Sequence, residues 1–149
     1  YSSLAKASNV NLSFESENNL PKILSDPKRI RLVVGNLMDN AIRYISGRGW
    51  VKIILKKKNH SLRCEIEDNG VGIPKSEQKY IFQKFFRGQS IIKYQTQGTG
   101  LGLFIAKAII KSSAGKIGFK SQESKGSVFW FELPINKQTT NNKQLTAKI

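Results

Sequence analysis

Three glycines at alternate positions, Gly98, Gly100 and Gly102, stand directly before a stretch with helical apolar periodicity. Glycine lets the backbone approach a ligand closely, and the first amides of a helix are open donors at the positive end of its dipole. With Thr99 and Leu101 between them, the glycines therefore indicate a phosphate-binding turn. A plain glycine-rich start of a helix has the same sequence, so this pattern is weak by itself.

A carboxylate followed by a second glycine-rich turn is another candidate. Asp68 ends an alternating strand and is followed by NGVGIP at 69–74. The carboxylate can accept a hydrogen bond from an exocyclic amine, while the glycines let the backbone curve around a planar ring. An ordinary turn begins with the same Asp-Asn-Gly residues. On this motif alone both interpretations stay open.

A third group of polar residues lies on one predicted helix. Asn36, Asn40 and Arg43 share a face at i, i+4 and i+7, and Tyr44 follows them. Asparagine is a poor residue for a helix interior, so two on one face suggest a purpose. A carboxamide oxygen suits Mg²⁺, which commonly also binds phosphates. Arg43 can then meet phosphate and Tyr44 an aromatic base, although a solvated helix face is the simpler alternative.

The elements that must position these residues follow from periodicity and from turn residues. Asp26-Pro27 gives an N-cap and a first helical proline. We expect a mobile loop over 87–99 and an exposed turn at 58–61 that contains His60. The pattern predicts an α+β fold, a two-layer α/β sandwich with helices on one face of a mixed, mostly antiparallel sheet. The first predicted helix runs from Pro27 until Gly47 and Gly49 stop it, and the others cover 75–86 and 101–113. The predicted strands are 9–16, a very short one at 23–24, 50–57, 62–68, 116–121 and 127–133.

Composition narrows the class of protein further. The 149 residues are 39% apolar, which suits one domain with a real core. Lys and Arg number 25 against 10 Asp and Glu, a net charge of +15, so we expect a polyanionic or acidic partner. A single cysteine and a single histidine exclude a disulfide framework and a Cys- or His-rich metal site. Without a signal peptide or a long apolar run, we expect a cytoplasmic piece of a longer protein, with no membrane contact.

In this order and spacing, the motifs resemble those of the bacterial-type sensor histidine kinases. NLMDNAIRY (36–44) is similar to their N box, DNGVGIP (68–74) to the G1 box, IFQKFFRG (81–88) to the F box and GTGLGLFIAKAII (98–110) to the G2 box. The resemblance implies the Bergerat ATP-binding fold shared with gyrase-type, mismatch-repair and chaperone ATPases. It implies an ATP-binding catalytic domain over 9–134, with an upstream linker or dimerisation-helix remnant at 1–8. The residues at 135–149 are polar and lack acidic groups, so we expect a disordered tail there.

The resemblance also implies a role for each matching residue. Asn40 matches the Mg²⁺ ligand and Asn36 its neighbour facing the nucleotide, while Arg43 matches a phosphate contact. Tyr44 matches the residue packed on adenine, and Asp68 the carboxylate that reads the adenine amino group. The implied cofactors are ATP and Mg²⁺.

The resemblance implies that the loop at 87–99 is a lid over the nucleotide. It assigns anchoring of this lid to Phe82 and Phe86, and phosphate contact to Arg87. The residues taken as catalytic are Asn36, Asn40, Arg43 and Arg87. The residues taken to contact the nucleotide are Asn36, Asn40, Arg43, Tyr44, Asp68, Gly70, Gly72, Ile73, Phe82, Phe86, Arg87, Gly98, Thr99, Gly100, Leu101 and Gly102.

Two departures from related ATPases shape the expected reaction. Asn36 stands where the ATPases carry a water-activating Glu, and a carboxamide is no general base, although Asp39 nearby keeps hydrolysis open. The phosphoacceptor helices are absent, so the expected acceptor is a histidine on a separate dimerisation domain. A response-regulator receiver domain is the next partner, and no nucleic acid is expected. The alternatives are an anti-sigma-type serine kinase on the same fold and a non-catalytic nucleotide-binding scaffold.

Overall fold

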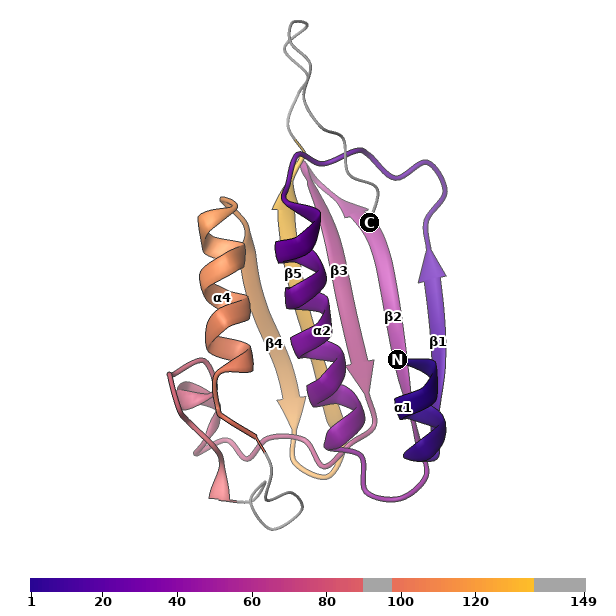
Figure 1. The fold of residues 1–149 in the computed structure, drawn as a ribbon, viewed down its shortest axis with the longest axis vertical. Helices are drawn as coiled ribbons and strands as arrows, with labels where there is room; N and C mark the ends of the chain where they lie inside the picture. The colour runs from indigo at the N-terminus through magenta and orange to yellow at the C-terminus, as the bar shows by residue number, and fades with distance from the viewer. Residues whose placement is uncertain (90–97, 136–149) are drawn as a thin grey trace, which may run out of the picture.

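The computed structural model describes residues 1–89 and 98–135 and places them in two layers (Figure 1). A five-stranded sheet carries helices on one face, which confirms the predicted α/β sandwich. The predicted tail and the middle of the predicted loop, at 136–149 and 90–97, lie outside the described residues. The strands are β1 (Val10–Ser16), β2 (Gly49–Lys58), β3 (Ser61–Asp68), β4 (Lys116–Gln122) and β5 (Gly126–Pro134).

The sheet has the order β1-β2-β3-β5-β4. Strands β1 and β2 run parallel, whereas each of the other neighbouring pairs is antiparallel. Strand β5 therefore lies between β3 and β4, although β3 precedes it by almost sixty positions in the sequence. This insertion places Asp68, at the end of β3, directly opposite Ser127, at the start of β5.

Helix α2 (Pro27–Arg43) begins as its sequence predicts. The Asp26 carboxylate accepts hydrogen bonds from the backbone amides of Lys28 (2.9 Å) and Arg29 (3.4 Å), and Pro27 occupies the first turn, where its missing N–H costs nothing. Helix α4 (Gly102–Ser112) packs beside α2 on the same face of the sheet (Figure 1). The two helices therefore run side by side, with α2 over β3 and β2 and α4 over β4 and β5.

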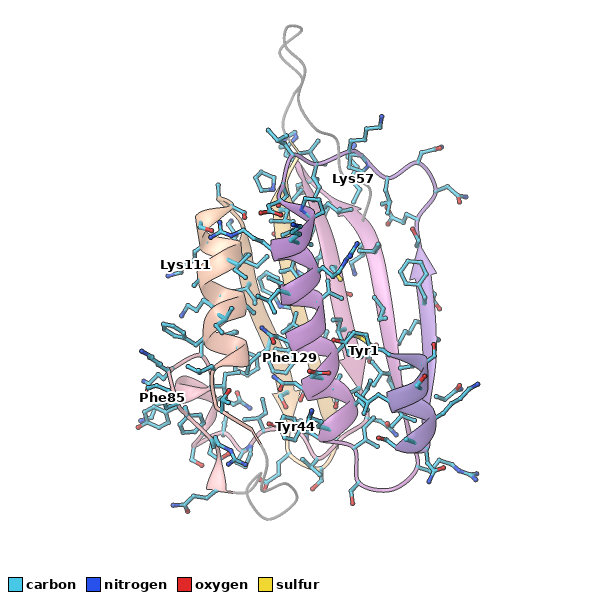
Figure 2. The ribbon with its side chains drawn as sticks, in the orientation of Figure 1. Tyr1, Tyr44, Lys57, Phe85, Lys111 and Phe129 are labelled. Carbon is cyan, nitrogen blue, oxygen red and sulfur yellow. The ribbon has the colours of Figure 1, made fainter. Side chains whose placement is uncertain are left out.

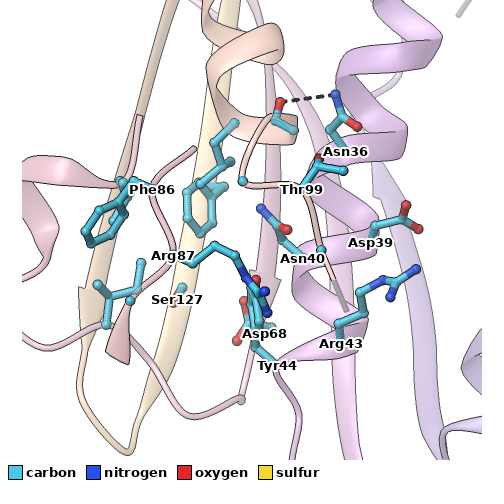
Figure 3. A pocket seen from close by; sticks show the side chains of 18 of the residues that line it. Asn36, Asp39, Asn40, Arg43, Tyr44, Asp68, Phe86, Arg87, Thr99 and Ser127 are labelled. Atoms are coloured by element: carbon cyan, nitrogen blue, oxygen red, sulfur yellow. Dashed lines mark hydrogen bonds between the residues drawn. The ribbon is translucent and has the colours of Figure 1, made fainter. Parts of the chain in front are cut away.

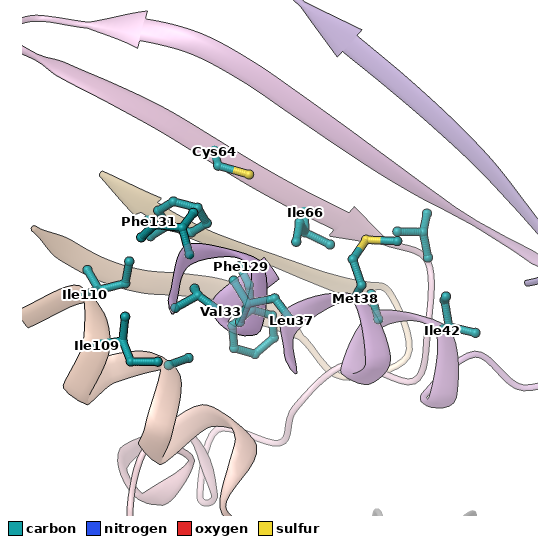
Figure 4. Packing of buried hydrophobic residues seen from close by; sticks show 14 of the residues in the cluster. Val33, Leu37, Met38, Ile42, Cys64, Ile66, Ile109, Ile110, Phe129 and Phe131 are labelled. Carbon is teal, nitrogen blue, oxygen red and sulfur yellow. The ribbon is translucent and has the colours of Figure 1, made fainter. Parts of the chain in front are cut away.

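The hydrophobic core lies between these two helices and the sheet (Figure 4). Leu37 of α2 and Ile110 of α4 are completely buried, and they meet Ile66 of β3 and Phe131 of β5. Burial of one such side chain contributes about 1.5–3 kcal/mol to folding, before the entropy cost. Packing of the apolar stripes therefore determines where the polar faces of α2 and α4 point.

A short helix at the N-terminus adds to the same layer. Helix α1 (Ser2–Ala7) buries Ala5 against the sheet, and its preceding residue Tyr1 reaches α2 (Figure 2). A Cβ atom added at Gly35 of α2 would lie 2.8 Å from the Tyr1 hydroxyl oxygen, so glycine is what permits this approach. The assignment of residues 1–8 to an upstream linker or helix stays a prediction.

The helix predicted over 75–86 is wrong. The structure has only a 3₁₀ turn, η1 (Gln78–Tyr80), joined by further turns. Phe85 has φ of +63°, which ends any right-handed helix there. The apolar side chains also serve different partners, because Phe82 packs on Phe119 of β4 (ring centroids 5.9 Å apart) while Tyr80 packs on Phe86 (5.6 Å). Apolar spacing alone does not distinguish such a set from a helical stripe.

None of the helices within residues 1–89 and 98–135 has both the length and the apolar composition that a bilayer crossing requires.

Candidate nucleotide-binding site

A cavity of about 380 Å³ opens at one end of the sandwich. Its walls come from the second half of α2, the start of α4, the paired ends of β3 and β5, and the segments that flank residues 90–97 (Figure 3). The predicted site residues that line it are Asn36, Asn40, Arg43, Tyr44, Asp68, Gly72, Ile73, Phe86, Arg87, Gly98, Thr99, Gly100 and Gly102. Gly70, Phe82 and Leu101 are not among the lining residues.

Asp68 is the most deeply buried charged group of the cavity. Only 6% of it is exposed, and its Oδ1 accepts a hydrogen bond from the Gly70 amide at 2.8 Å. Burial raises the pKa of Asp68 to about 6, although hydrogen bonds to the backbone at Gly70 and Ser127 act in the opposite direction. A buried carboxylate with unused lone pairs can accept hydrogen bonds from a ligand's N–H groups.

The glycine-rich turn after Asp68 is attached to both neighbouring elements. The Val71 amide donates to the Tyr44 carbonyl at the end of α2 (2.9 Å). A Cβ atom at Gly70 would lie 2.8 Å from Asp68 Oδ1, and one at Gly72, which has φ of +66°, would collide with the Gln122 carbonyl. Glycine is therefore required at both positions. Gly70 shapes the cavity from outside, since it orients Asp68 without lining the space itself.

The polar face of α2 forms the opposite wall. Asn36 and Asn40 are partly buried, whereas Arg43 is exposed and lies with Asp39 at the rim (Figure 3). The Asn36 amide nitrogen donates to the Gly102 carbonyl of α4 at 3.1 Å. The two asparagines therefore differ in their surroundings, because Asn36 is already engaged with the neighbouring helix.

The third wall is formed by the two stems of the predicted lid, the segment that ends near Phe85 and the segment that begins near Gly100. The Phe85 amide donates to the Gly100 carbonyl at 3.0 Å. Gly100 has φ of +68°, and a Cβ there would lie 2.8 Å from the Phe85 carbonyl carbon. Phe82 does not reach the cavity and instead anchors this stem on Phe119. The chain that leaves and the chain that returns are thus held together just outside residues 87–99.

Two cationic side chains influence Tyr44 at the base of the cavity. Burial raises the pKa of the Tyr44 hydroxyl, while the positive charges of Arg87 and Arg43 act to lower it. Both arginines therefore lie close enough to act on one point, although one comes from α2 and the other from the lid stem. Their combined charge favours an anionic ligand at this place.

Several lining residues are not among the predicted site residues. Ser127 and Phe129 come from β5 and lie outside all four motifs, whereas Ile81, Gly88 and Leu103 lie within the F-box and G2-box segments. Phe129 is a buried, inward-facing residue of β5. The alternating pattern of that strand in the sequence indicates a core residue. Only the pairing of β3 with β5 brings Ser127 opposite Asp68, and no local pattern encodes that pairing.

The donor set fits a metal ion that shares its ligands with a phosphate group. Within the described part of the chain, no three His, Cys, Asp or Glu side chains gather as a metal site. Mg²⁺ binds through one or two protein oxygens and takes its remaining ligands from phosphates and water. The Asn40 carboxamide, beside an anion-favouring cavity, meets that requirement.

The sandwich, the buried acceptor and the glycine-rich turn before α4 are features of a nucleotide-binding domain, and comparison with known proteins shows the family. Residues 25–137 match the family described as histidine kinase-, DNA gyrase B- and HSP90-like ATPases. The match covers most of the chain, and the chain therefore belongs to this family.

Individual relatives show which members of this family the chain resembles. Adaptive-response sensory kinase SasA from Synechocystis sp. is 38% identical over 128 residues, which is 85% of this chain and 33% of SasA. The chain thus spans about a third of the length of that relative. The catalytic domain of histidine kinase ThkA, in a nucleotide-free form, matches with a TM-score of 0.77 at 33% identity, over 90% of this chain and 84% of that domain.

Two further structures show related domains in complexes. Full-length ShkA with AMPPNP matches with a TM-score of 0.78 at 27% identity, over 92% of this chain and 28% of ShkA. ThkA bound to the response regulator protein TrrA matches with a TM-score of 0.71 at 28% identity, over 91% of this chain and 37% of that one. The chain is a catalytic ATPase domain of the histidine kinase type.

Proposed function

We propose that this domain binds Mg²⁺-ATP in the cavity and donates the γ-phosphate to a histidine on a separate dimerisation domain. The observation that carries the proposal is the placement of Asp68. This buried acceptor faces the same cavity as the glycine-rich start of α4, so one ligand can place a base amine at the first and phosphates at the second. The AMPPNP bound to ShkA supports an adenine nucleotide as that ligand.

The proposed roles follow from where the side chains lie. Asp68 accepts a hydrogen bond from the adenine amine, and Tyr44 packs beside the base. Arg43, Arg87 and the first amides of α4 neutralise phosphate charge. When bound through Asn40, Mg²⁺ would supply further charge neutralisation at the phosphates. The protein contributes positioning and electrostatics, which suffice for phosphoryl transfer.

The histidine that receives the phosphate must come from outside the described residues. His60, the single histidine of the chain, is exposed in the turn between β2 and β3. Strand β3 has eight residues between that turn and the cavity, and at 3.3 Å per residue it separates His60 from Asp68 by about 25 Å. The acceptor therefore belongs to another domain or chain, and a receiver domain follows it, as the ThkA complex with TrrA suggests. We place this reaction on the cytoplasmic side.

Calorimetric titration of the 149-residue chain tests the proposal. We expect ATP to bind more tightly with Mg²⁺ than without it, and GTP to bind at least tenfold more weakly. Guanine presents a carbonyl oxygen where adenine presents its amine, so Asp68 would face an acceptor and stay unpaired. Equal affinity for both nucleotides would contradict the proposed base contact.

Phosphotransfer distinguishes the kinase from a nucleotide-binding scaffold. The chain is incubated with γ-labelled ATP and a purified histidine-containing dimerisation domain, and acid-labile label on that domain is measured. Replacement of the acceptor histidine by Gln is the control. Tight ATP binding without transfer would favour the scaffold. The relatives described above are histidine kinases, so they do not support a serine kinase.

A further inference from the structure

The Asn36 side chain forms a polar bridge between α2 and α4 at the edge of the cavity. Its Nδ2 donates to the Gly102 carbonyl at 3.1 Å, across a sequence separation of 66 residues. A Cβ atom added at Gly102 would lie 3.5 Å from both Cγ and Oδ1 of Asn36. The carboxamide therefore lies within contact distance of the first residue of α4, with its nitrogen directed at that residue's carbonyl oxygen (Figure 3).

The start of α4 has no side-chain cap of its own. Leu101, at the N-cap position, makes no side-chain cap hydrogen bond, and the first turn contains no acidic residue. The Leu101 amide has a long hydrogen bond to Thr99 Oγ1 at 3.3 Å. Without a cap of its own, the start of α4 depends on contacts with neighbouring elements for its position. At this end of the helix, Asn36 supplies such a contact from a rigid helix.

Asn36 also links the two sides of the proposed phosphate site. It precedes Asn40 by one turn of α2, so both side chains face the same cavity. A hydrogen bond from Asn36 to Gly102 thus sets the distance between Asn40 and the open amides of α4. In a site where positioning supplies most of the catalysis, a shift of about 1 Å in that distance is expected to matter.

We propose that Asn36 is a positioning residue that holds the phosphate-binding start of α4 against α2, rather than a ligand of the metal ion. The inference rests on the proposed function and deepens it, because it assigns Asn36 to the phosphate side of the site through a hydrogen bond. It gives different roles to Asn36 and Asn40, which the N-box resemblance assigns to the same nucleotide-facing group. On this assignment the Asn36 nitrogen donates to protein, and the carboxamide oxygen that would bind Mg²⁺ is that of Asn40.

Asn36→Leu tests this assignment, since leucine has nearly the same shape but neither donor nor ligand atoms. Affinity is measured by calorimetry for ATP with Mg²⁺, ATP with EDTA, and adenosine. We expect ATP affinity to fall about tenfold both with and without Mg²⁺, while adenosine affinity stays within twofold. Asn40→Leu is the matched control, the same substitution one helical turn later, and should lower ATP affinity only when Mg²⁺ is present.

Each other outcome overturns the inference. Loss confined to the Mg²⁺ condition would identify Asn36 as a metal ligand, and unchanged ATP affinity would show that the bridge is dispensable. Equal loss for adenosine would indicate a general folding role, and Asn36→Ala replaces the leucine variant if that variant does not fold. The titration of wild-type protein distinguishes failure of the proposed function from failure of the positioning role of Asn36. If wild-type protein fails to bind ATP, the proposed function fails, whereas the inference fails only if wild-type binds and the variant does not follow the pattern.

Discussion

At the scale of single residues, the buried Asp68 carboxylate lowers the stability of the ligand-free protein. In the proposed complex, the same carboxylate binds the base. The Asp68 carboxylate lies 94% buried, where water cannot solvate its charge fully. A ligand that brings an N–H group to the carboxylate relieves this cost, and a ligand without one does not. In the proposed complex, the same burial that destabilises the ionised side chain would therefore provide selectivity for a base with an exocyclic amine.

We predict that Asp68→Asn lowers affinity for ATP and for adenosine at least tenfold, because the amide removes the negative charge that the base amine meets. The unfolding free energy at pH 7.5 should be unchanged or higher, since an uncharged acceptor can still bond the Gly70 amide. Calorimetry and urea unfolding measure the two effects. Glu67→Gln is the matched control, with the same charge change one residue earlier on the other face of β3. Retained ATP affinity in Asp68→Asn would contradict the assignment.

Asp68 should also give the ligand-free protein a distinct pH dependence. Its pKa is about 6 when folded and near 3.8 when unfolded, so the folded state binds the extra proton between these values. Stability from this group is therefore gained as pH falls, by about 1–2 kcal/mol between pH 7.5 and pH 5.0. Urea unfolding at both pH values measures it, with Asp68→Asn subtracted to remove other titrating groups. An identical pH dependence in the two proteins would refute the buried charge.

At the scale of elements, the structure determines where the lid begins. The Phe85 amide and the Gly100 carbonyl join the two stems, and the backbone of each has positive φ. A bulky residue such as phenylalanine adopts this conformation only when its surroundings enforce it. The Phe85 ring is 64% exposed, so packing of the side chain does not account for the strained backbone. The contact with Gly100 is the constraint that the structure shows.

We predict that Gly100→Ala destabilises the protein by about 2–4 kcal/mol, because its Cβ would meet the Phe85 backbone in addition to the cost of positive φ. ATP affinity should also fall severalfold as the stems separate. Gly47→Ala is the control, since Gly47 has φ of +80° and nothing within 4 Å of an added Cβ. It should cost about 1 kcal/mol, the conformational part alone. Equal losses in the two variants would mean that the stem contact is unimportant.

At the scale of the whole molecule, the face of the sheet opposite the helices has its own stabilising network. Arg63 is 8% exposed, forms ion pairs with Glu65 and Glu132, and stacks on Trp130 with its Cζ 4.1 Å from the ring centroid. Lys56 and Lys58 complete the pairing of the two carboxylates at 2.9 and 3.0 Å. This network joins β2, β3 and β5 without contributing to the cavity.

We predict that Arg63→Ala lowers the unfolding free energy by about 2–4 kcal/mol, because it leaves two partly buried carboxylates close together and uncovers Trp130. ATP affinity should stay within twofold, since the cavity lies on the other face. Arg63→Lys should recover part of the stability by restoring the charge without the planar fork. Urea unfolding and calorimetry provide the measurements. A large loss of ATP affinity in folded Arg63→Ala would show that the two faces are coupled.

Local chemistry in the sequence determined most of the fold. The Asp26-Pro27 cap, the alternating strands and the glycine-rich turns each depend on neighbouring residues. Helix α4 and all five strands lie within about two residues of their predicted bounds, and α2 begins where predicted but ends at Arg43, before Gly47. The order of the four motifs indicated the family, because each motif carries its chemistry within a few positions. For the same reason, most of the residues selected from these motifs line the cavity in the structure.

Contacts between distant segments decided the rest. The spacing of Phe82 and Phe86 predicts a helical stripe. In the structure the two rings pack on different partners, and the positive φ of Phe85 is incompatible with the expected helix. Ser127 enters the cavity because β5 lies between β3 and β4, and Asn36 bonds Gly102 because α4 packs beside α2. Pairing and packing of this kind depend on which surfaces meet, which no local period encodes. The sequence thus specified the parts of the site, and the tertiary structure decided which parts touch.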